Sequence, residues 1–261
     1  MRVIRVLTAL FAIFLAVQGS PIGKIIGGDN AEEGEFPWQV SLRDNGRHFC
    51  GGTLISNQHV LTAAHCLISR NLTITTVITG TNSLARGGET HAVKTITYHS
   101  KFVGGSESYR YDVGVITLAA PLTVSNVQRP IALASENTPI AVDLVVSGWG
   151  RALYPSDTLP TMLQKVHLTA LDIKSCQHFW PDMRIYMDHL CALKEYGAGV
   201  CNGDSGGPLV YNNEVVGIVS WGNPCARGVP DVYTRVYSYL IWIREILNNT
   251  ERKFDFIEIT E

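Results

Sequence analysis

Short apolar stretches separated by turn residues run along most of the chain. They are rich in Val, Ile, Thr and aromatic residues, and Gly, Asn, Asp or Pro bounds them. This pattern is typical of the strands of a β-sandwich or β-barrel. The clearest stretches are 38–42, 52–55, 72–79, 113–118, 144–148, 208–210 and 215–221. We therefore predict an all-β fold class.

One segment near the C-terminus has helical rather than alternating periodicity. Its apolar positions are Tyr237, Leu240, Ile241, Ile243, Ile246 and Leu247. Spacings of three and four residues predict a C-terminal helix over 237–247. The remaining tail, 248–261, is polar with two Phe residues, and the sequence assigns it no role.

The N-terminus has the layout of a secretory signal. Arg2 and Arg5 precede an apolar run at 6–17, and the small residues Gly19 and Ser20 follow it. This order predicts a signal peptide over 1–19 and a secreted, extracellular protein; the alternative is a buried helix of the mature fold. The run is shorter than the roughly 20 residues that span a bilayer, and no later run is longer, so we expect no membrane attachment.

Composition narrows the classes of function. With 21 Lys and Arg against 23 Asp and Glu, the net charge is −2, which does not fit the basic surface of a nucleic-acid-binding protein. Hydrophobic residues make up 46% and charged residues only 17%, which excludes intrinsic disorder. The length of 261 residues allows one large β unit or two smaller ones.

The six cysteines leave three uses open on composition alone: disulfides, metal ligands and free thiols. Secretion into an oxidising compartment favours disulfides. The chain has no Cys-x-x-Cys or His-rich spacing typical of zinc sites, so we predict no metal.

Three short segments carry candidate chemistry. Residues 61–66 (Leu-Thr-Ala-Ala-His-Cys) contain His65, Asp112 opens an apolar strand, and residues 201–208 (Cys-Asn-Gly-Asp-Ser-Gly-Gly-Pro) contain Ser205. Glycines at this density allow a tight turn that brings backbone N–H groups close to a substrate. Taken singly, each segment has a structural alternative: a surface or core histidine, a turn aspartate, and a plain turn beside a disulfide.

Taken together, these segments resemble the chymotrypsin family of serine peptidases. The sequence TAAHC, then an Asp that opens an apolar strand, then GDSGGP follow an IIGG start in that order, and the resemblance covers 25–247. The order His, Asp, Ser separates this family from subtilisins and α/β-hydrolases. The resemblance implies a peptidase domain over 25–247 with two six-stranded antiparallel β-barrels around a shared active-site cleft, at about 25–135 and 136–236, and a C-terminal helix.

The resemblance also implies a role for each motif residue. Ser205 is expected to be the nucleophile, His65 its base and then the acid, and Asp112 the group that orients the imidazole. The backbone N–H groups of Gly203 and Ser205 are expected to form the oxyanion hole, with Asn202 on the pocket rim.

Activation follows from the same resemblance. Asp204, beside the nucleophile, needs a partner if it is buried, because an unpaired buried carboxylate is costly. In the family that partner is the new α-ammonium group of the mature chain, which here is Ile25 after cleavage behind Lys24. We therefore expect a zymogen with an activation propeptide over 20–24.

Six cysteines allow 15 disulfide connectivities, so the pairing is taken from the resemblance and not from the sequence itself. The implied bridges are Cys50–Cys66, Cys176–Cys191 and Cys201–Cys225. The family's calcium loop is built on glutamates, which the matching stretch 80–84 lacks at its start, so we expect neither calcium nor a cofactor.

Substrate preference is expected to depend on three residues. Gly199, six positions before the nucleophile, lies where trypsin-like members have Asp at the base of the primary specificity pocket. Gly222 leaves the pocket mouth open, so both glycines favour large apolar or aromatic residues. Asp231 stands on the wall where most members have Gly, and a substrate Lys or Arg would pair with it. The combination resembles insect chymotrypsins, which we prefer, and also broad-specificity crustacean collagenolytic enzymes.

The overall expectation is a secreted digestive serine endopeptidase, monomeric and made as a zymogen. Its expected partners are protein or peptide substrates, an activating trypsin-like protease and proteinaceous inhibitors. The alternatives are a broad-specificity collagenolytic-type enzyme, a regulatory protease of venom, saliva or immunity, and an inactive homologue, against which the intact triad weighs. The sequons at Asn71 and Asn248 are either glycosylation sites or unused surface turns.

Overall fold

The computed structural model describes residues 27–152, 157–223 and 225–258, with side chains as far as residue 249. The predicted signal peptide over 1–19 and the propeptide over 20–24 lie outside the described residues, as do Lys24 and Ile25.

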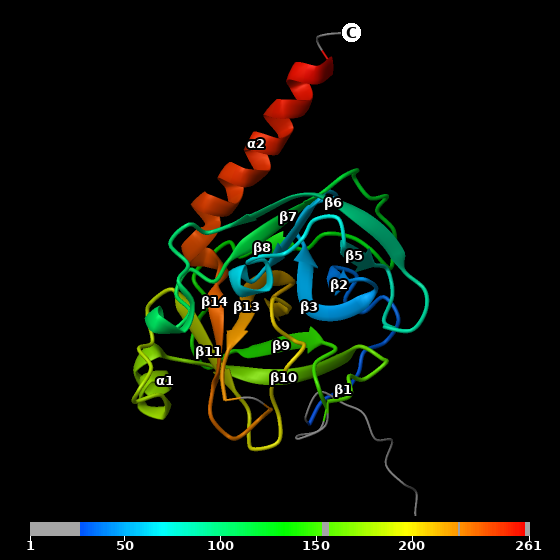
Figure 1. Ribbon diagram of the computed structural model, residues 1–261. Helices are drawn as coiled ribbons and strands as arrows, with labels where there is room; N and C mark the ends of the chain where they lie inside the picture. The colour runs from blue at the N-terminus through cyan, green and yellow to red at the C-terminus, as the bar shows by residue number, and fades with distance from the viewer. Residues whose placement is uncertain (1–26, 153–156, 224, 259–261) are drawn as a thin grey trace, which may run out of the picture.

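Six antiparallel strands close into a first barrel in the order β2-β3-β4-β7-β6-β5 (Figure 1). The strands are β2 (Gln39–Asp44), β3 (Arg47–Leu54), β4 (His59–Thr62), β5 (Thr75–Thr79), β6 (Glu89–Tyr98) and β7 (Gly114–Leu118). Their inward residues form an apolar core; β7, for example, is buried along its whole length. Val, Ile and Thr favour strands because their branched side chains pack well on a pleated surface.

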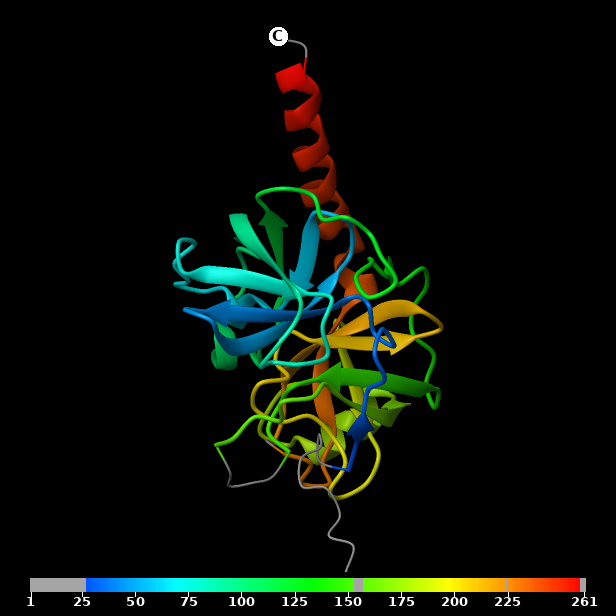
Figure 2. The ribbon, with the colours of Figure 1, turned by 90° about the vertical axis from the view of Figure 1, so that its right-hand side faces the viewer.

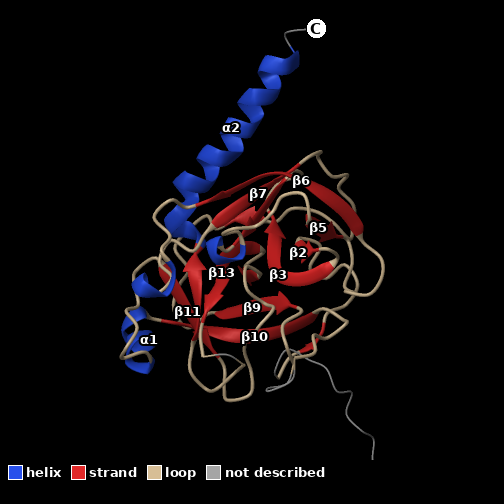
Figure 3. Cartoon of the chain, viewed as in Figure 1, coloured by secondary structure: helices blue, strands red, loops and turns tan. Residues whose placement is uncertain are grey.

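A second barrel forms from the later part of the chain, since β9 pairs with both β10 and β12 and closes the sheet. Figure 3 shows both barrels as strands joined by long loops. The strands are β9 (Asp143–Gly148), β10 (Gln164–Leu171), β11 (His189–Leu193), β12 (Pro208–Tyr211), β13 (Glu214–Trp221) and β14 (Asp231–Arg235). The predicted pair of six-stranded barrels is confirmed.

Two short strands lie on a different barrel from the one that chain order suggested. Both β1 (Asp29–Asn30) and β8 (Ala132–Leu133) fall within 25–135, the range expected for the first barrel. The structure pairs β1 with β10 and β8 with β13, both in the second barrel. A strand of two residues has no periodicity of its own, so its partner cannot be recognised from the sequence.

The C-terminal helix is longer than expected and begins later. A 3₁₀ turn, η3 (Val236–Tyr239), precedes α2 (Leu240–Glu258), which continues through most of the tail. Figures 1 and 2 show α2 projecting away from the barrels. The sequence of α2 contains neither Gly nor Pro, so nothing stops the helix at residue 247. Among the described residues, no helix is long and apolar enough to cross a membrane.

One further helix was not expected. The short helix α1 (Ile173–Phe179) begins after Asp172, whose side chain accepts a hydrogen bond from the backbone N–H of Ser175. This is a standard N-cap, because it satisfies a donor that has no partner within the helix. The helix carries Cys176, which fixes it to β11 through the bridge to Cys191.

Candidate active site

The strand pairing brings the three candidate segments together at the junction of the barrels. His65 lies in the 3₁₀ turn η1 (Ala64–Cys66) after β4, and Asp112 lies just before β7. Since β4 and β7 pair through Thr62 and Gly114, the two segments are neighbours. The carbonyl of Ser205 accepts a hydrogen bond of 2.7 Å from the N–H of Gly51 on β3, so the serine of the second half is attached to the first barrel.

Asp112 and His65 form a closely bonded pair. The Asp112 side chain is fully buried and accepts from the backbone N–H of His65 at 2.9 Å and from the imidazole Nδ1 at 2.8 Å. Ser220 donates to the same carboxylate at 2.6 Å, and Thr234 donates to the Asp112 carbonyl at 2.7 Å. A carboxylate only accepts hydrogen bonds, so Nδ1 carries the proton and Nε2 is the basic nitrogen.

Two opposing effects act on the pKa of His65. Burial lowers it, but the charge of Asp112 and the hydrogen bond to it raise it more, so the pKa lies above its ordinary value despite a smaller lowering by Arg70. The ring is therefore suited to take up a proton and to hold it as an imidazolium ion.

The turn around Ser205 orients two backbone N–H groups. The carbonyl of Asn202 accepts from the N–H of Arg151, and the carbonyl of Asp204 accepts from the N–H of Gly207, both at 2.9 Å. In a trans peptide the N–H points opposite to the C=O, so the N–H groups of Gly203 and Ser205 point away from these interior contacts. Gly203 has φ +106°, which a residue with a side chain rarely adopts. The turn can thus present two adjacent donors to a developing oxyanion.

A hydrogen-bonded chain that the sequence analysis missed supports this turn from the first barrel. His48 donates from Nε2 to the carbonyl of Gly203 at 3.0 Å, and its Nδ1 accepts from the hydroxyl of Ser41 at 2.9 Å. Burial, and to a lesser extent the charge of Arg43, lowers the pKa of His48 to about 4, although the hydrogen bond to Gly203 acts in the opposite direction. His48 is therefore neutral near pH 7 and acts as a fixed support.

Asp204 lies in a cage of backbone groups. It is fully buried and accepts from the N–H groups of Gly150 at 2.7 Å and Cys201 at 2.9 Å. A Cβ atom on Gly148 or Gly150 would lie 2.1 Å from a carboxylate oxygen, so both positions require glycine. Burial raises the pKa of Asp204 to about 6, against the effect of its two hydrogen bonds. No cationic side chain pairs with it in the part of the chain that the structure describes.

A cavity of about 470 Å³ opens beside His65 and Ser205. Its walls are mainly apolar and aromatic. They include Tyr109, Trp180, Met183, Val200, Val219 and Trp221. Tyr109, Trp180 and Met183 were not expected from the sequence, because single residues outside strands and helices leave no periodic signal. The size and apolar lining suit a large side chain of a substrate.

Asp231 lies at the wall of this cavity and contacts the positions of both Gly199 and Gly222. A Cβ atom on Gly199 would lie 2.6 Å from its Oδ2, and one on Gly222 would lie 3.0 Å from its Oδ1. The glycines thus make room for the carboxyl group. Gly222 lines the cavity, whereas Gly199 lies behind Asp231 and is not among the described lining residues.

The Asp231 carboxyl has little support for a negative charge. It is 5% exposed, and Oδ2 accepts one hydrogen bond, from the N–H of Val200 at 2.9 Å. Burial raises its pKa to about 8, against that hydrogen bond and with a further rise from the charge of Asp204. Nearby, the Tyr233 hydroxyl is buried without a partner among the described residues. Near pH 7 this carboxyl group of the cavity wall is therefore mostly neutral.

All three implied disulfides are present: Cys50–Cys66, Cys176–Cys191 and Cys201–Cys225. The first lies beside His65, and Cys201 of the third, in the same turn as Ser205, lines the cavity. Cys50, Cys66 and His65 form the one described grouping with metal-ligand spacing, but both sulfurs are bonded to each other and offer no thiolate. Asn71 and Asn248 are both exposed.

Comparisons with known proteins agree with this geometry. The sequence model of the trypsin family matches residues 25–243. Chymotrypsin-2 of Vespa crabro is 37% identical over 85% of this chain and 99% of its own length. Trypsin theta of Drosophila melanogaster is 39% identical over 85% of both chains, and trypsin 5G1 of Aedes aegypti is 36% identical over 94% of this chain and 98% of its own. The chain therefore belongs to the trypsin family of serine endopeptidases.

Proposed function

We propose that this chain is a secreted endopeptidase that cleaves after large apolar or aromatic residues through an acyl-enzyme. The Ser205 hydroxyl transfers its proton to Nε2 of His65 and attacks the scissile carbonyl, while Asp112 stabilises the imidazolium ion. The oxyanion is bound by the N–H groups of Gly203 and Ser205. His65 then protonates the leaving amine, and water releases the acyl group by the reverse proton transfers.

The observation that carries the catalytic part is the hydrogen bond between the buried Asp112 and His65, whose ring borders the same cavity as Ser205. The test is labelling of the activated protein with a fluorophosphonate, followed by identification of the labelled residue. We expect stoichiometric labelling at Ser205 and almost none in His65→Ala. An activated wild-type chain that resists labelling would contradict the proposal and favour a non-enzymatic homologue.

The apolar cavity supports the preference for large apolar residues. Burying such a side chain contributes about 1.5–3 kcal/mol, and a neutral Asp231 does not oppose it. The relatives include proteins named chymotrypsin and trypsin, so similarity alone does not decide the preference. A broad specificity is the second candidate, because a substrate Lys or Arg brings a counter-charge that would favour the ionised form of Asp231.

Synthesis as a zymogen is supported by the cage around Asp204. The cage supplies two N–H donors to a fully buried carboxylate but no cation among the described residues. We assign the missing charge to the α-ammonium group of Ile25, released by a trypsin-like protease that cleaves after Lys24.

Replacing Lys24 tests this activation step. Lys24→Gln is expected to give a secreted precursor that stays inactive when incubated with trypsin, while the wild-type precursor gains activity. Conversion is followed on gels and by activity against a Phe peptide amide. Substantial activity of Lys24→Gln would contradict the zymogen proposal.

The physiological part of the proposal is a digestive role. We further propose that the enzyme acts as a monomer on protein or peptide substrates and is open to proteinaceous inhibitors.

A further inference from the structure

The segment that leads into Asp112 has a strained backbone. Ser108, Tyr109 and Tyr111 have φ values of 50°, 56° and 65°, in the left-handed region that residues with side chains avoid. Such conformations persist only where surrounding contacts hold them, and they concentrate at functional sites. The ring of Tyr109 lines the cavity and lies edge-on to His65, with 6.2 Å between ring centroids.

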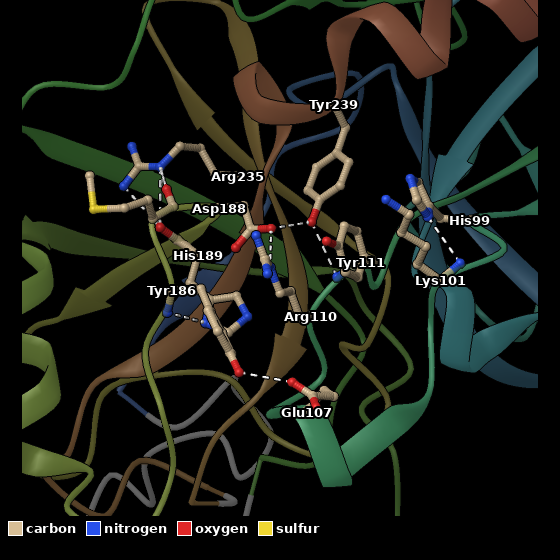
Figure 4. Close-up of polar contacts among 11 residues, drawn as sticks. His99, Lys101, Glu107, Arg110, Tyr111, Tyr186, Asp188, His189, Arg235 and Tyr239 are labelled. Atoms are coloured by element: carbon tan, nitrogen blue, oxygen red, sulfur yellow. Dashed lines mark hydrogen bonds and ion pairs between the residues drawn. The ribbon is translucent and has the colours of Figure 1, made fainter.

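Figure 4 shows what holds this segment. Asp188 Oδ2 accepts from Nε of Arg110 at 2.9 Å and from the hydroxyl of Tyr239 at 2.8 Å. The Tyr239 oxygen in turn accepts from the backbone N–H of Tyr111 at 3.1 Å. A continuous path of hydrogen bonds thus runs from Asp188 through Tyr239 to the residue directly before Asp112.

The path crosses between the two halves of the molecule. Asp188 lies one residue before β11, and Tyr239 is the last residue of η3, after β14. The second half therefore holds Asp112 directly, through Ser220 and Thr234, and also holds the preceding peptide through Tyr239.

Side-chain packing makes this path rigid. Tyr239 is 5% exposed and the Asp188 side chain 12%, so water screens their contacts poorly. The guanidinium of Arg110 lies over the rings of Tyr111 and Tyr186, at 4.8 and 4.7 Å. His99 stacks on the Tyr111 ring with centroids 4.8 Å apart.

We propose that Asp188 and Tyr239 are positioning residues for the peptidase reaction, because they fix the strained segment that places Asp112 against His65 and Tyr109 on the cavity wall. This inference rests on the catalytic roles proposed for His65 and Asp112. Neither positioning residue touches the substrate or the reacting atoms.

Loss of the path has kinetic consequences that loss of stability alone does not have. If the segment relaxes, the contact between Asp112 and Nδ1 of His65 weakens, which lowers kcat. Because Asp112 raises the pKa of His65, the acid limb of the kcat/KM profile then moves to lower pH. Movement of Tyr109 changes the shape of the cavity that it lines, which raises KM.

The test compares Tyr239→Phe and Asp188→Ala with the wild type, using the full chain after activation. Active-site concentration is measured by titration of Ser205, and then kcat, KM, the pH profile and the melting temperature are determined with a Phe tetrapeptide amide. We expect kcat per active site to fall about tenfold in each variant, as for the loss of one good hydrogen bond in the transition state, and the acid limb to shift to lower pH. Asp188→Asn, which keeps an acceptor oxygen, is expected to recover most of the kcat lost in Asp188→Ala.

A matched control is Asp143→Asn, since Asp143 forms an exposed pair with His167 at 2.9 Å on the second barrel. It is expected to leave all kinetic values unchanged. If Tyr239→Phe and both Asp188 variants change only the melting temperature, with kcat, KM and pH profile at wild-type values, the positioning role is wrong. An activated wild-type chain that neither hydrolyses peptides nor reacts at Ser205 overturns the proposed function and this inference with it.

Discussion

Two buried carboxylates of the candidate site, Asp112 and Asp231, have opposite surroundings. Asp112 is fully buried and accepts three hydrogen bonds, two from His65 and one from Ser220. Asp231 is 5% exposed and accepts one, from the N–H of Val200, and its pKa is raised to about 8. The comparison shows that burial alone does not set the role of an acid: the donors and charges around it do.

The fold explains the difference. Asp112 lies where the barrels meet, so both supply donors to it, including Ser220 on β13 and Thr234 on β14. Asp231 begins β14 at the cavity wall between Gly199 and Gly222, neither of which has a side chain that could donate. The Asp112 carboxylate is bonded to the imidazole of His65, whereas the Asp231 carboxyl lies at the cavity wall and accepts from one backbone N–H group.

The largest effect is expected from replacing Asp112, the carboxylate that is bonded to His65. Asp112→Asn should lower kcat by about 10⁴-fold, the loss known for the equivalent change in this family, because an amide favours the wrong histidine tautomer. The measurement is kcat per titrated active site on a Phe peptide amide at pH 7. Asp231→Asn is the matched control and should keep kcat on the same substrate within about threefold. If kcat of Asp112→Asn fell less than tenfold, the proposed difference in role between Asp112 and Asp231 would be contradicted.

A smaller effect on substrate preference is expected from the ionisation of Asp231 with pH. With a pKa of about 8, Asp231 is mostly neutral at pH 7 and mostly ionised at pH 9, and its ionised fraction rises about tenfold between them. The ratio of kcat/KM for an Arg substrate to that for a Phe substrate should therefore rise several-fold over this range. Titration of His65 affects both substrates and cancels in the ratio. Asp231→Asn should give a flat ratio, and a flat ratio in the wild type as well would contradict the assignment.

The smallest expected effect is on stability. Because the pKa of Asp231 is raised on folding, the folded state holds the proton more tightly than the unfolded chain, and stability falls as pH rises from about 4 to about 8. Asp231→Asn has no carboxyl group at this position and does not lose stability in this way. The melting temperature of the variant minus that of the parent should therefore be a few °C larger at pH 8 than at pH 5. Both proteins are to be measured in a Ser205→Ala background, which prevents self-digestion. An equal difference at both pH values would mean that the acid ionises freely in the folded state.

Most of the architecture could be predicted because its signals are local or come from motifs. Alternation and turn residues indicate strands, and the His65 and Ser205 motifs indicate the family, from which the disulfide pairing follows. The partner of β1 could not be predicted, because β1 pairs with a strand far along the chain. The extension of α2 to Glu258 was also not predicted, because it depends on the absence of a stop signal.

The supporting residues of the site could not be predicted for the same reason. Ser220 is hydrogen-bonded to Asp112, and Tyr239 to the preceding residue Tyr111, and both contacts join positions more than 100 residues apart in the chain. The sequence analysis assigned Gly199 and Asp231 to one pocket, but only the structure shows that the Asp231 carboxyl group occupies the space beside that glycine.

The most direct test of the account is substrate preference at pH 7. After activation, kcat/KM is measured on matched peptide amides that differ only in having Phe, Leu, Arg or Lys at the cleaved position. The apolar cavity and the neutral Asp231 predict that Phe and Leu are cleaved faster than Arg and Lys. A preference for Arg over Phe would contradict the proposed preference for large apolar or aromatic residues.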